Sequence, residues 1–337
     1  RELVDPHNGL ADLQAGSLRT PVSAEQSFDD DPLRMLRAAR FASQLGFDVD
    51  LEVMEAMEQM AQRLEIVSAE RIRAELERLL LSPYPRRGLE LLVHTGICDI
   101  VLPEVSALQD TVDEHRRHKD VYEHTLTVLQ QAMDLETGPD GAVPGPDLRL
   151  RLAALMHDIG KPATRRFMPD GTVTFHAHDY VGARMTAKRM RALHFDKQTI
   201  KDVSRLVELH LRFHGYADSP WSDSAVRRYV TDAGPLLSRL GCLTRADVTT
   251  GNRRKAAMLS HAYDDLERRI EALRQQEELA SIRPELDGQE IMAELGIKPG
   301  PEVGKAYKFL LDLRMERGPI GKELAREALH SWWATQQ

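Results

Sequence analysis

Aromatic residues and cysteines are scarce in this chain. Of its 337 residues, 5% are Phe, Trp or Tyr and 2 are cysteines. β-Branched residues occur only in short runs, while Leu, Ala, Arg and Glu dominate, and this composition predicts a mainly helical protein. Cys98 and Cys242 belong to no paired motif, so they indicate buried thiols in a reducing cytoplasm rather than a redox site.

Long hydrophobic runs and an excess of positive charge are also missing. The chain has no stretch of about twenty apolar residues and no signal-peptide pattern, so we expect a cytoplasmic protein with no membrane partner. The formal net charge of −8 argues against a uniformly cationic nucleic-acid binder. Local basic clusters remain, among them Arg34, Arg37 and Arg40, and their default interpretation is a solvated helix face.

Histidine, in contrast, is concentrated in one region. The chain has 13 histidines, and most lie between residues 115 and 214. His157 and Asp158 follow an apolar run in which leucines recur at helical spacing. The pair is therefore predicted on the last turn of a buried helix. Gly160 is expected to end this helix, and Pro162 to prevent its continuation.

Other candidate metal ligands flank this pair. His124 lies in a predicted upstream helix, and a Pro-Asp-Gly turn at residues 169–171 predicts a hairpin that leads to His176 and His178. His210 lies near a helix end, and Asp247 closes the set. Neutral imidazoles and carboxylates that converge can hold a divalent cation, so the region predicts a metal site.

The order of these residues resembles that of the HD superfamily of metal-dependent phosphohydrolases. The resemblance implies that His124, His157, Asp158 and Asp247 bind the metal, with Mn, Ni, Fe or Mg as the candidate ions. It makes Asp158, Lys161 and His178 the catalytic candidates, because Lys161 can neutralise a phosphate oxygen. His178 and His210 would hold a second metal or donate protons, with His176 as the alternate for His178. The remaining histidines of the region are expected at surface or supporting positions; they are His115, His118, His194 and His214.

A second motif lies near the N-terminus. Asp31 followed by Pro32 predicts a helix start, and the acidic run that ends at Asp31 would complement the helix dipole. Capping does not explain Arg34, one turn further on. A carboxylate acceptor and a planar donor on one helix face can read the edge of a nucleobase as well as pair with each other.

Residues 3–47 resemble the end of the head and the start of the neck in bacterial class II tRNA nucleotidyltransferases. The matching residues are Asp5, Pro6, Gly9, Asp12 and Leu13, then Asp30, Asp31 and Arg34. The resemblance implies that Asp31 and Arg34 bind the base of CTP or ATP, with Asp30 and Arg37 in the same nucleotide-binding set. It also implies tRNA as a partner, with RNA-contact candidates at Arg71, Gly300, Gly304 and Lys305.

The family's catalytic head binds Mg through an Asp-x-Asp pair after a Gly-Gly turn, and neither precedes Arg1. Asp48-Val49-Asp50 is interpreted as a helix start, and the strand-like run at Leu3 and Val4 lacks a sheet partner in the sequence. We therefore expect the last three quarters or so of such an enzyme, unable to add nucleotides by itself. The expected parts are a head remnant (1–24), a neck (25–85), connecting helices (86–117), an HD domain (118–250) and a helical tail (251–337).

Other hypotheses stay open at this point. The chain can be a stand-alone HD phosphohydrolase acting on 2′,3′-cyclic phosphates or phosphomonoesters, or a non-catalytic RNA-binding fragment. The motif at Asp31 and Arg34 favours the nucleotidyltransferase, because a free phosphohydrolase has no use for a base-reading pair. The sequence does not separate CCA addition from poly(A) addition, and it leaves the HD substrate, the metal and the oligomeric state unknown.

Overall fold

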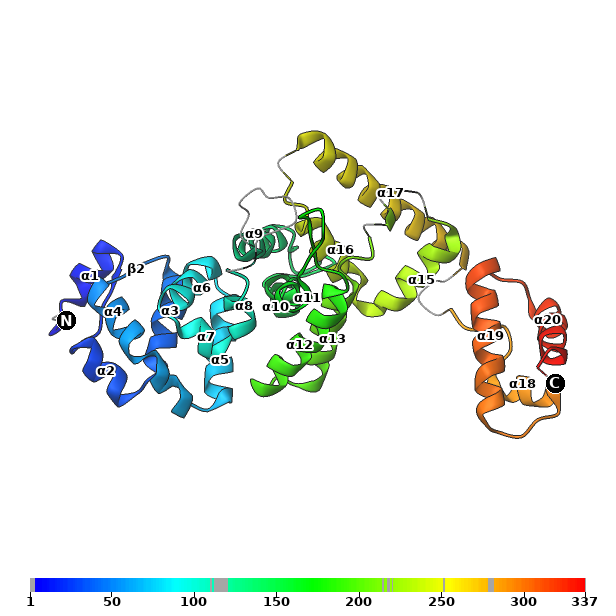
Figure 1. The fold of residues 1–337 in the computed structure, drawn as a ribbon, viewed down its shortest axis with the longest axis horizontal. Helices are drawn as coiled ribbons and strands as arrows, with labels where there is room; N and C mark the ends of the chain where they lie inside the picture. Colours follow the sequence, from blue (N-terminus) through cyan, green and yellow to red (C-terminus); the bar gives the residue numbers. More distant parts are fainter. Residues whose placement is uncertain are drawn as a thin grey trace. The chain divides into compact units, whose positions relative to one another are not determined.

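The structure is a computed structural model that describes residues 4–109, 111, 121–213, 215–216, 219, 221–250, 252–277 and 282–336. The chain forms two compact units, one of residues 1–211 and 238–249 and the other of residues 212–237 and 250–337. Helices dominate both units (Figure 1), and each strand named in the described ranges has two residues. The predicted mainly helical fold is confirmed.

The first unit begins with a short helix and a short strand, α1 (Gly9–Ala15) and β1 (Ser17–Leu18). β1 pairs in parallel with β2 (Asp48–Val49). Gly46, with a φ of 69°, follows the helix that ends at Leu45 and turns the chain toward β2. Val4 is in no strand, in agreement with its lack of a sheet partner. The helix start interpreted at residues 48–50 is only partly right, since Asp50 caps the next helix but Asp48 and Val49 form β2.

The predicted helix start at Asp31 is only partly right. α2 (Ala24–Asp30) precedes α3 (Leu33–Leu45), and Asp31 Oδ1 accepts a hydrogen bond from the Leu33 backbone N–H at 3.2 Å. Asp29 and Asp30, however, lie in the last turn of α2, where the helix dipole is negative. The acidic run therefore does not complement the dipole of α3, as the sequence had suggested.

α3 is the central helix of the neck, and its inner face is fully buried at Met35, Leu36 and Ala39. It packs against α5 (Ala69–Leu80) and α6 (Pro85–His94). Gly88 allows α6 to approach closely, because a Cβ there would lie 2.7 Å from the Ala39 carbonyl oxygen. The neck is completed by α4 (Leu51–Met60) and the 3-10 helix η1 (Ala61–Ile66).

The rest of the first unit is a helical bundle with one hairpin. α10 (Leu148–Met156) lies at its centre, packed on α9 (Val121–Asp134) and α13 (Lys197–Leu209), with every residue from Leu150 to Met156 buried. The predicted hairpin is β3 (Arg166–Phe167) paired with β4 (Val173–Thr174). The remaining elements are α7 (Ile97–Val101), α8 (Pro103–Ser106), α11 (Lys161–Thr164), α12 (His178–Ala192) and α16 (Leu237–Ala246).

Gly160 and Pro162 act differently from the prediction. α10 ends at Met156, but Gly160 has a φ of −77° rather than a left-handed cap conformation. Pro162 lies in the first turn of the short helix α11. Position 160 has no room for a side chain, because a Cβ there would lie 2.1 Å from the His178 carbonyl oxygen. The glycine thus lets α12 pack directly against the His157–Asp158 turn.

The second unit contains two groups of packed helices. α17 (Arg253–Glu277) packs on α15 (Asp223–Ala233) and buries Tyr263, Leu266, Ile270 and Leu273 along one stripe. A separate core forms among the last three helices around Ile291, Leu310 and Leu329. Those helices are α18 (Gly288–Leu295), α19 (Pro301–Arg317) and α20 (Lys322–Ala334), and η2 (Gly234–Leu236) follows α15.

Two further properties bear on the expectations from composition. Among the described residues, no helix combines the length and the apolar character that a membrane span requires. Cys98 is buried as expected, whereas Cys242 is only partly buried.

Candidate metal centre and neck motif

All six predicted metal-ligand candidates come together in the first unit. His124 projects from α9, the doublet His157–Asp158 follows α10, His178 opens α12, His210 follows α13, and Asp247 follows α16. His157 and Asp158 are 0% and 1% exposed, so the centre of the cluster is closed to bulk water. Residues separated by more than 120 positions thus form one site.

Side-chain nitrogen and carboxylate atoms face one another at short range. His124 Nε2 lies 3.0 Å from Asp247 Oδ1, and His157 Nε2 lies 3.2 Å from Asp158 Oδ2. His178 Nε2 lies 3.3 Å from Asp158 Oδ1. Two groups have ligand atoms within 4.8 Å of one another, His124–His157–Asp158 and Asp158–His178–His210. Asp158 belongs to both groups, so its carboxylate could contribute to either one.

The outer nitrogen of each imidazole is held by a hydrogen bond. Nδ1 lies 2.8 Å from Ala154 O in His157, 2.9 Å from Phe175 O in His178 and 2.6 Å from Val207 O in His210. A carbonyl oxygen only accepts, so each Nδ1 carries a proton and each Nε2 faces the cluster. Such an arrangement is typical of metal-binding histidines.

His124 is the one imidazole held by a side chain. Its Nδ1 lies 3.0 Å from Thr249 Oγ1, while its Nε2 faces Asp247 and Asp158. Sequence reasoning missed Thr249, although a hydroxyl two residues after a candidate ligand was a usable signal.

The charged groups of the cluster favour a bound cation. Burial raises the pKa of the Asp158 carboxyl, but His157 and Lys161 outweigh it and hold that pKa well below its usual range. Burial likewise opposes charge on His157, yet Asp158 and Asp247 raise its pKa to about 10. In His210, burial and the positive charge of His157 lower the pKa to about 4. Without a metal, one proton on His157 therefore sits between two carboxylates, in the place that a cation suits.

Buried polar atoms also fit a metal. Nε2 of His178 and Nε2 of His210 are buried and have no hydrogen-bond partner within the described ranges. A buried imidazole lone pair without a partner is costly unless a ligand occupies it. Together with the two carboxylates, these atoms form a donor set of imidazole nitrogens and carboxylate oxygens that suits a divalent transition metal.

The other residues predicted near this cluster are placed as follows. Lys161 Nζ lies 2.8 Å from Asp158 Oδ2 and is largely buried. His176 is exposed, so His178 and not its alternate enters the cluster. His194 lies elsewhere, in an ion pair with Glu70. His115, His118 and His214 lie outside the described residues.

In the neck, Asp31 and Arg34 do not pair with each other. Arg71 Nη2 donates to both carboxylate oxygens of Asp31, at 3.0 and 3.1 Å, while Arg34 Nη1 donates to Ser27 O at 3.1 Å. Both side chains stay partly exposed, Asp31 at 23% and Arg34 at 41%. Asp30 lies 3.7 Å from Arg34 and is more exposed, at 58%. The acceptor and the donor are thus held by different partners, and each side chain stays partly exposed.

A buried carboxylate that the sequence analysis missed lies beside Arg37. Glu75 is 5% exposed and lies 2.6 Å from Arg40 Nε and 3.8 Å from Arg37 Nε. The sequence carries a signal for it, because Glu75 lies beside apolar residues at helical spacing, Ile72, Leu76 and Leu79. Glu75 thus pairs closely with Arg40, while Arg37 lies farther away with 43% of its side chain exposed.

The predicted RNA-contact residues fall in two places. Arg71 is half exposed and engaged with Asp31. Gly300 precedes α19, and Gly304 and Lys305 are exposed in its first turns.

Two family models match the chain. One, described as the probable RNA and SrmB- binding site of polymerase A, matches residues 46–108. The other, the HD domain, matches residues 121–252 and so contains all six residues of the cluster.

Characterised relatives match along nearly the whole chain. The A-adding tRNA nucleotidyltransferase of Deinococcus radiodurans is 35% identical over 344 residues, covering 100% of this chain and 75% of the relative. The CC-adding tRNA nucleotidyltransferase of Thermus thermophilus is 36% identical over 324 residues, covering 94% of this chain and 69% of the relative. The crystal structure of the Bacillus stearothermophilus CCA-adding enzyme in complex with CTP shares the fold, with a TM-score of 0.63 at 18% identity over 99% of this chain and 69% of that one. The chain therefore belongs to the family of tRNA nucleotidyltransferases that carry an HD domain.

Proposed function

We propose that this chain acts in nucleotide addition at the 3′ ends of tRNA, with CTP or ATP as the incoming nucleotide and Mg²⁺ as the ion of that transfer. The observation that supports this proposal is the match, along the whole chain, to relatives named for A addition and CC addition. Both names are those of enzymes that extend tRNA rather than messenger RNA, which favours tRNA extension over poly(A) addition.

Asp31 and Arg34 are the residues we assign to the base. Arg34 offers guanidinium donors and Asp31 offers carboxylate acceptors, and a base edge carries complementary groups. Arg71 is better placed to orient Asp31 than to contact RNA, because it donates to both carboxylate oxygens. Arg37 lies 3.8 Å from Glu75 and keeps 43% of its side chain exposed, so its guanidinium is available for a phosphate.

Nucleotide binding to the chain tests this assignment. We expect CTP or ATP to bind more tightly than GTP and UTP, and Arg34→Ala to abolish that preference, since one lost charged hydrogen bond costs about 1.5–3 kcal/mol. Arg63→Ala, which removes an arginine of equal exposure paired with Asp29, is the matched control. Equal binding of all four nucleotides by the unmodified chain would contradict the assignment.

For the cluster in the HD domain we propose metal-dependent hydrolysis of phosphate esters, with 2′,3′-cyclic phosphates and 2′-phosphates as the candidate substrates. The supporting observation is the set of imidazole Nε2 atoms that face Asp158. His124, His157, Asp158 and Asp247 would hold one ion, and His178 and His210 with Asp158 a second. Imidazole-rich sets favour Mn, Fe or Ni over Mg, which prefers oxygen ligands.

The chain's own residues supply the other parts of this chemistry. A divalent ion held there lowers the pKa of a coordinated water and polarises a phosphate oxygen. Lys161, 2.8 Å from Asp158, brings a positive charge beside the place where a phosphate would bind. Burial of His157 and Asp158 excludes bulk water, which strengthens these electrostatic interactions.

Hydrolysis of 2′,3′-cyclic AMP tests the second proposal. The reaction should depend on added Mn²⁺ or Ni²⁺ and should stop on Asp158→Ala, while tRNA binding stays nearly unchanged. His94→Ala, at a histidine of the same unit outside the cluster, is the control. Loss of hydrolysis and tRNA binding together would mean that Asp158 is a core residue rather than a ligand.

A further inference from the structure

The hairpin of β3 and β4 connects two parts of the HD cluster. It follows Lys161 and leads to His178. Its tip is closed by its own hydrogen bonds, from Met168 N–H to Thr172 O at 2.8 Å and from Thr172 N–H to Asp170 Oδ1 at 2.9 Å. The turn therefore needs no contact from the apolar side chains that the hairpin carries.

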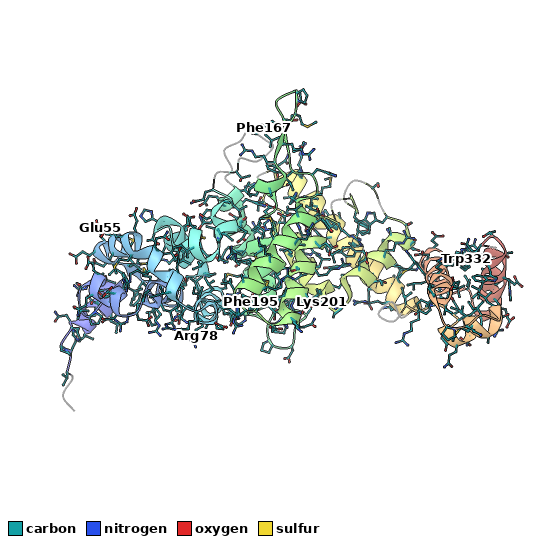
Figure 2. The ribbon with its side chains drawn as sticks, turned by 60° about the horizontal axis from the view of Figure 1, so that its bottom comes forward. Glu55, Arg78, Phe167, Phe195, Lys201 and Trp332 are labelled. Carbon is teal, nitrogen blue, oxygen red and sulfur yellow. The ribbon has the colours of Figure 1, made fainter. Side chains whose placement is uncertain are left out.

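Phe167 is the most exposed of these apolar side chains. It is 70% exposed, and Figure 2 shows it on the part of the hairpin that projects beyond the neighbouring helices of its unit. The guanidinium carbon of Arg165 lies over its ring, 4.8 Å from the centroid. An aromatic ring with a cation over one face and its other face open is suited to stacking with a nucleobase.

The face that carries this pair continues to the cluster. Phe167 lies opposite Val173, and Arg166 lies opposite Thr174. Extending this register places Arg165 opposite Phe175, on the same face as Phe167 because side chains alternate along a strand. Lys161 Nζ lies 5.7 Å from the centre of the Phe175 ring and 2.8 Å from Asp158. Phe167 is two register steps from Phe175, or about 7 Å along the hairpin.

We propose that Phe167, backed by Arg165, stacks with the terminal base of an RNA whose phosphate ester occupies the HD cluster. This rests on the proposed phosphohydrolase function and adds a specificity-determining residue to it. The short separation along one face suits one nucleotide, with its base on Phe167 and its phosphate beside Lys161. The exposed side chain of Arg166 points to the opposite face and would contact an RNA backbone there.

A local probe tests the stacking without any need for hydrolysis. In the full chain, Phe167→Trp places an indole on the hairpin, and the signal of the native tryptophans is subtracted with the unmodified chain. A trinucleotide RNA should quench the added emission in a saturable way, whereas a trinucleotide with an abasic 3′ terminus should not. Equal quenching by both, or by neither, overturns the proposal.

Hydrolysis then tests specificity. With a trinucleotide that ends in a 2′,3′-cyclic phosphate, Phe167→Ala should lower kcat/KM by roughly tenfold, the order expected for one lost base–aromatic stack. Phe167→Tyr should restore the rate, because it keeps the ring. Ribose 2′,3′-cyclic phosphate, which has no base, should show no such loss. Ile66→Ala, at a side chain that is 76% exposed and distant from the hairpin, controls for the removal of an exposed apolar group.

The outcomes separate the two proposals. A tenfold loss on both esters, or on neither, overturns the stacking role of Phe167. If the unmodified chain and His157→Ala hydrolyse neither ester, the phosphohydrolase proposal fails, and the emission of Phe167→Trp still decides whether the hairpin binds a base.

Discussion

His124 is oriented by the hydroxyl of Thr249, whereas the other imidazoles of the metal centre are oriented by backbone carbonyls. A side-chain substitution can remove the first kind of hydrogen bond but not the second. The other imidazoles are held by carbonyls within their own turns, three residues earlier in the chain. Thr249 reaches His124 from a segment 125 residues away. The orientation of this ligand can therefore be changed by one substitution that leaves every helix intact.

Thr249→Val should weaken metal binding about 10- to 100-fold, the usual cost of losing a group that orients a ligand. The valine keeps the volume of the side chain but cannot bond His124 Nδ1. Competition with a chelator measures the affinity. Thr127→Val, on the same helix as His124, serves as the control, and equal affinities of Thr249→Val and the control would contradict the assigned role.

Cys98 offers a second prediction at this scale. Burial, with a contribution from Asp99, raises the pKa of its thiol to about 12. A raised pKa keeps the thiol protonated, and so unreactive, at every pH below that value. In the folded chain at a pH of about 8 or 9, iodoacetamide should therefore leave Cys98 unmodified, as read by peptide mass spectrometry. If Cys98 in the folded chain were alkylated as fast as in the urea-unfolded chain, this prediction would be wrong.

At the scale of elements, the close contact between α12 and the His157–Asp158 turn depends on Gly160. Gly160→Ala places a Cβ 2.1 Å from the His178 carbonyl oxygen and 2.7 Å from the Gly182 nitrogen, both backbone atoms. The helix must shift, which we expect to cost about 1–3 kcal/mol of unfolding free energy and to move His178 out of the cluster. Urea unfolding and metal affinity measure the two effects.

Gly138→Ala is the matched control for that change. A Cβ at Gly138 meets nothing within 4 Å, so this variant should keep its stability. If Gly160→Ala were as stable as Gly138→Ala and bound metal equally well, the contact between the two segments would not support the site.

The elements show which parts of the site the sequence could predict. The hairpin and the helices of the HD cluster follow from local patterns, namely the Pro-Asp-Gly turn and the apolar periodicity around Leu148 and Leu155. The strand β2 could not be predicted, because two residues carry no periodicity and depend on β1, which lies 31 positions earlier. The positions of Thr249 and Glu75 likewise depend on contacts between segments far apart in the chain, which a single sequence does not encode locally.

The neck motif shows the same limit for side chains. Its residues were predicted from the Asp31–Arg34 spacing and from resemblance. The spacing allowed the two side chains to pair, but Asp31 accepts from Arg71 and Arg34 donates to Ser27. The competing partners come from α5 and α2. A one-turn spacing indicates which groups share a face, and the packed neighbours decide which of them bond.

The whole molecule combines the sequence of a tRNA nucleotidyltransferase with a candidate metal site in its first unit. The relatives establish a tRNA nucleotidyltransferase with an HD domain, and the geometry of the first unit adds a buried donor set for a divalent metal. Metal binding should also stabilise the fold. At an ion concentration about a hundred times the Kd, one site contributes about 2.7 kcal/mol to the free energy of unfolding.

The most direct test is the metal content of the purified chain, measured together with hydrolysis of a 2′,3′-cyclic nucleotide in the unmodified protein and in His157→Ala. We expect stoichiometric divalent metal, activity and a thermal midpoint that falls on chelation, with all three effects absent in the variant while tRNA binding is kept. If the unmodified chain bound no metal and hydrolysed nothing, yet still bound tRNA, the imidazole cluster would be a structural feature only, and the proposed phosphohydrolase function would be wrong.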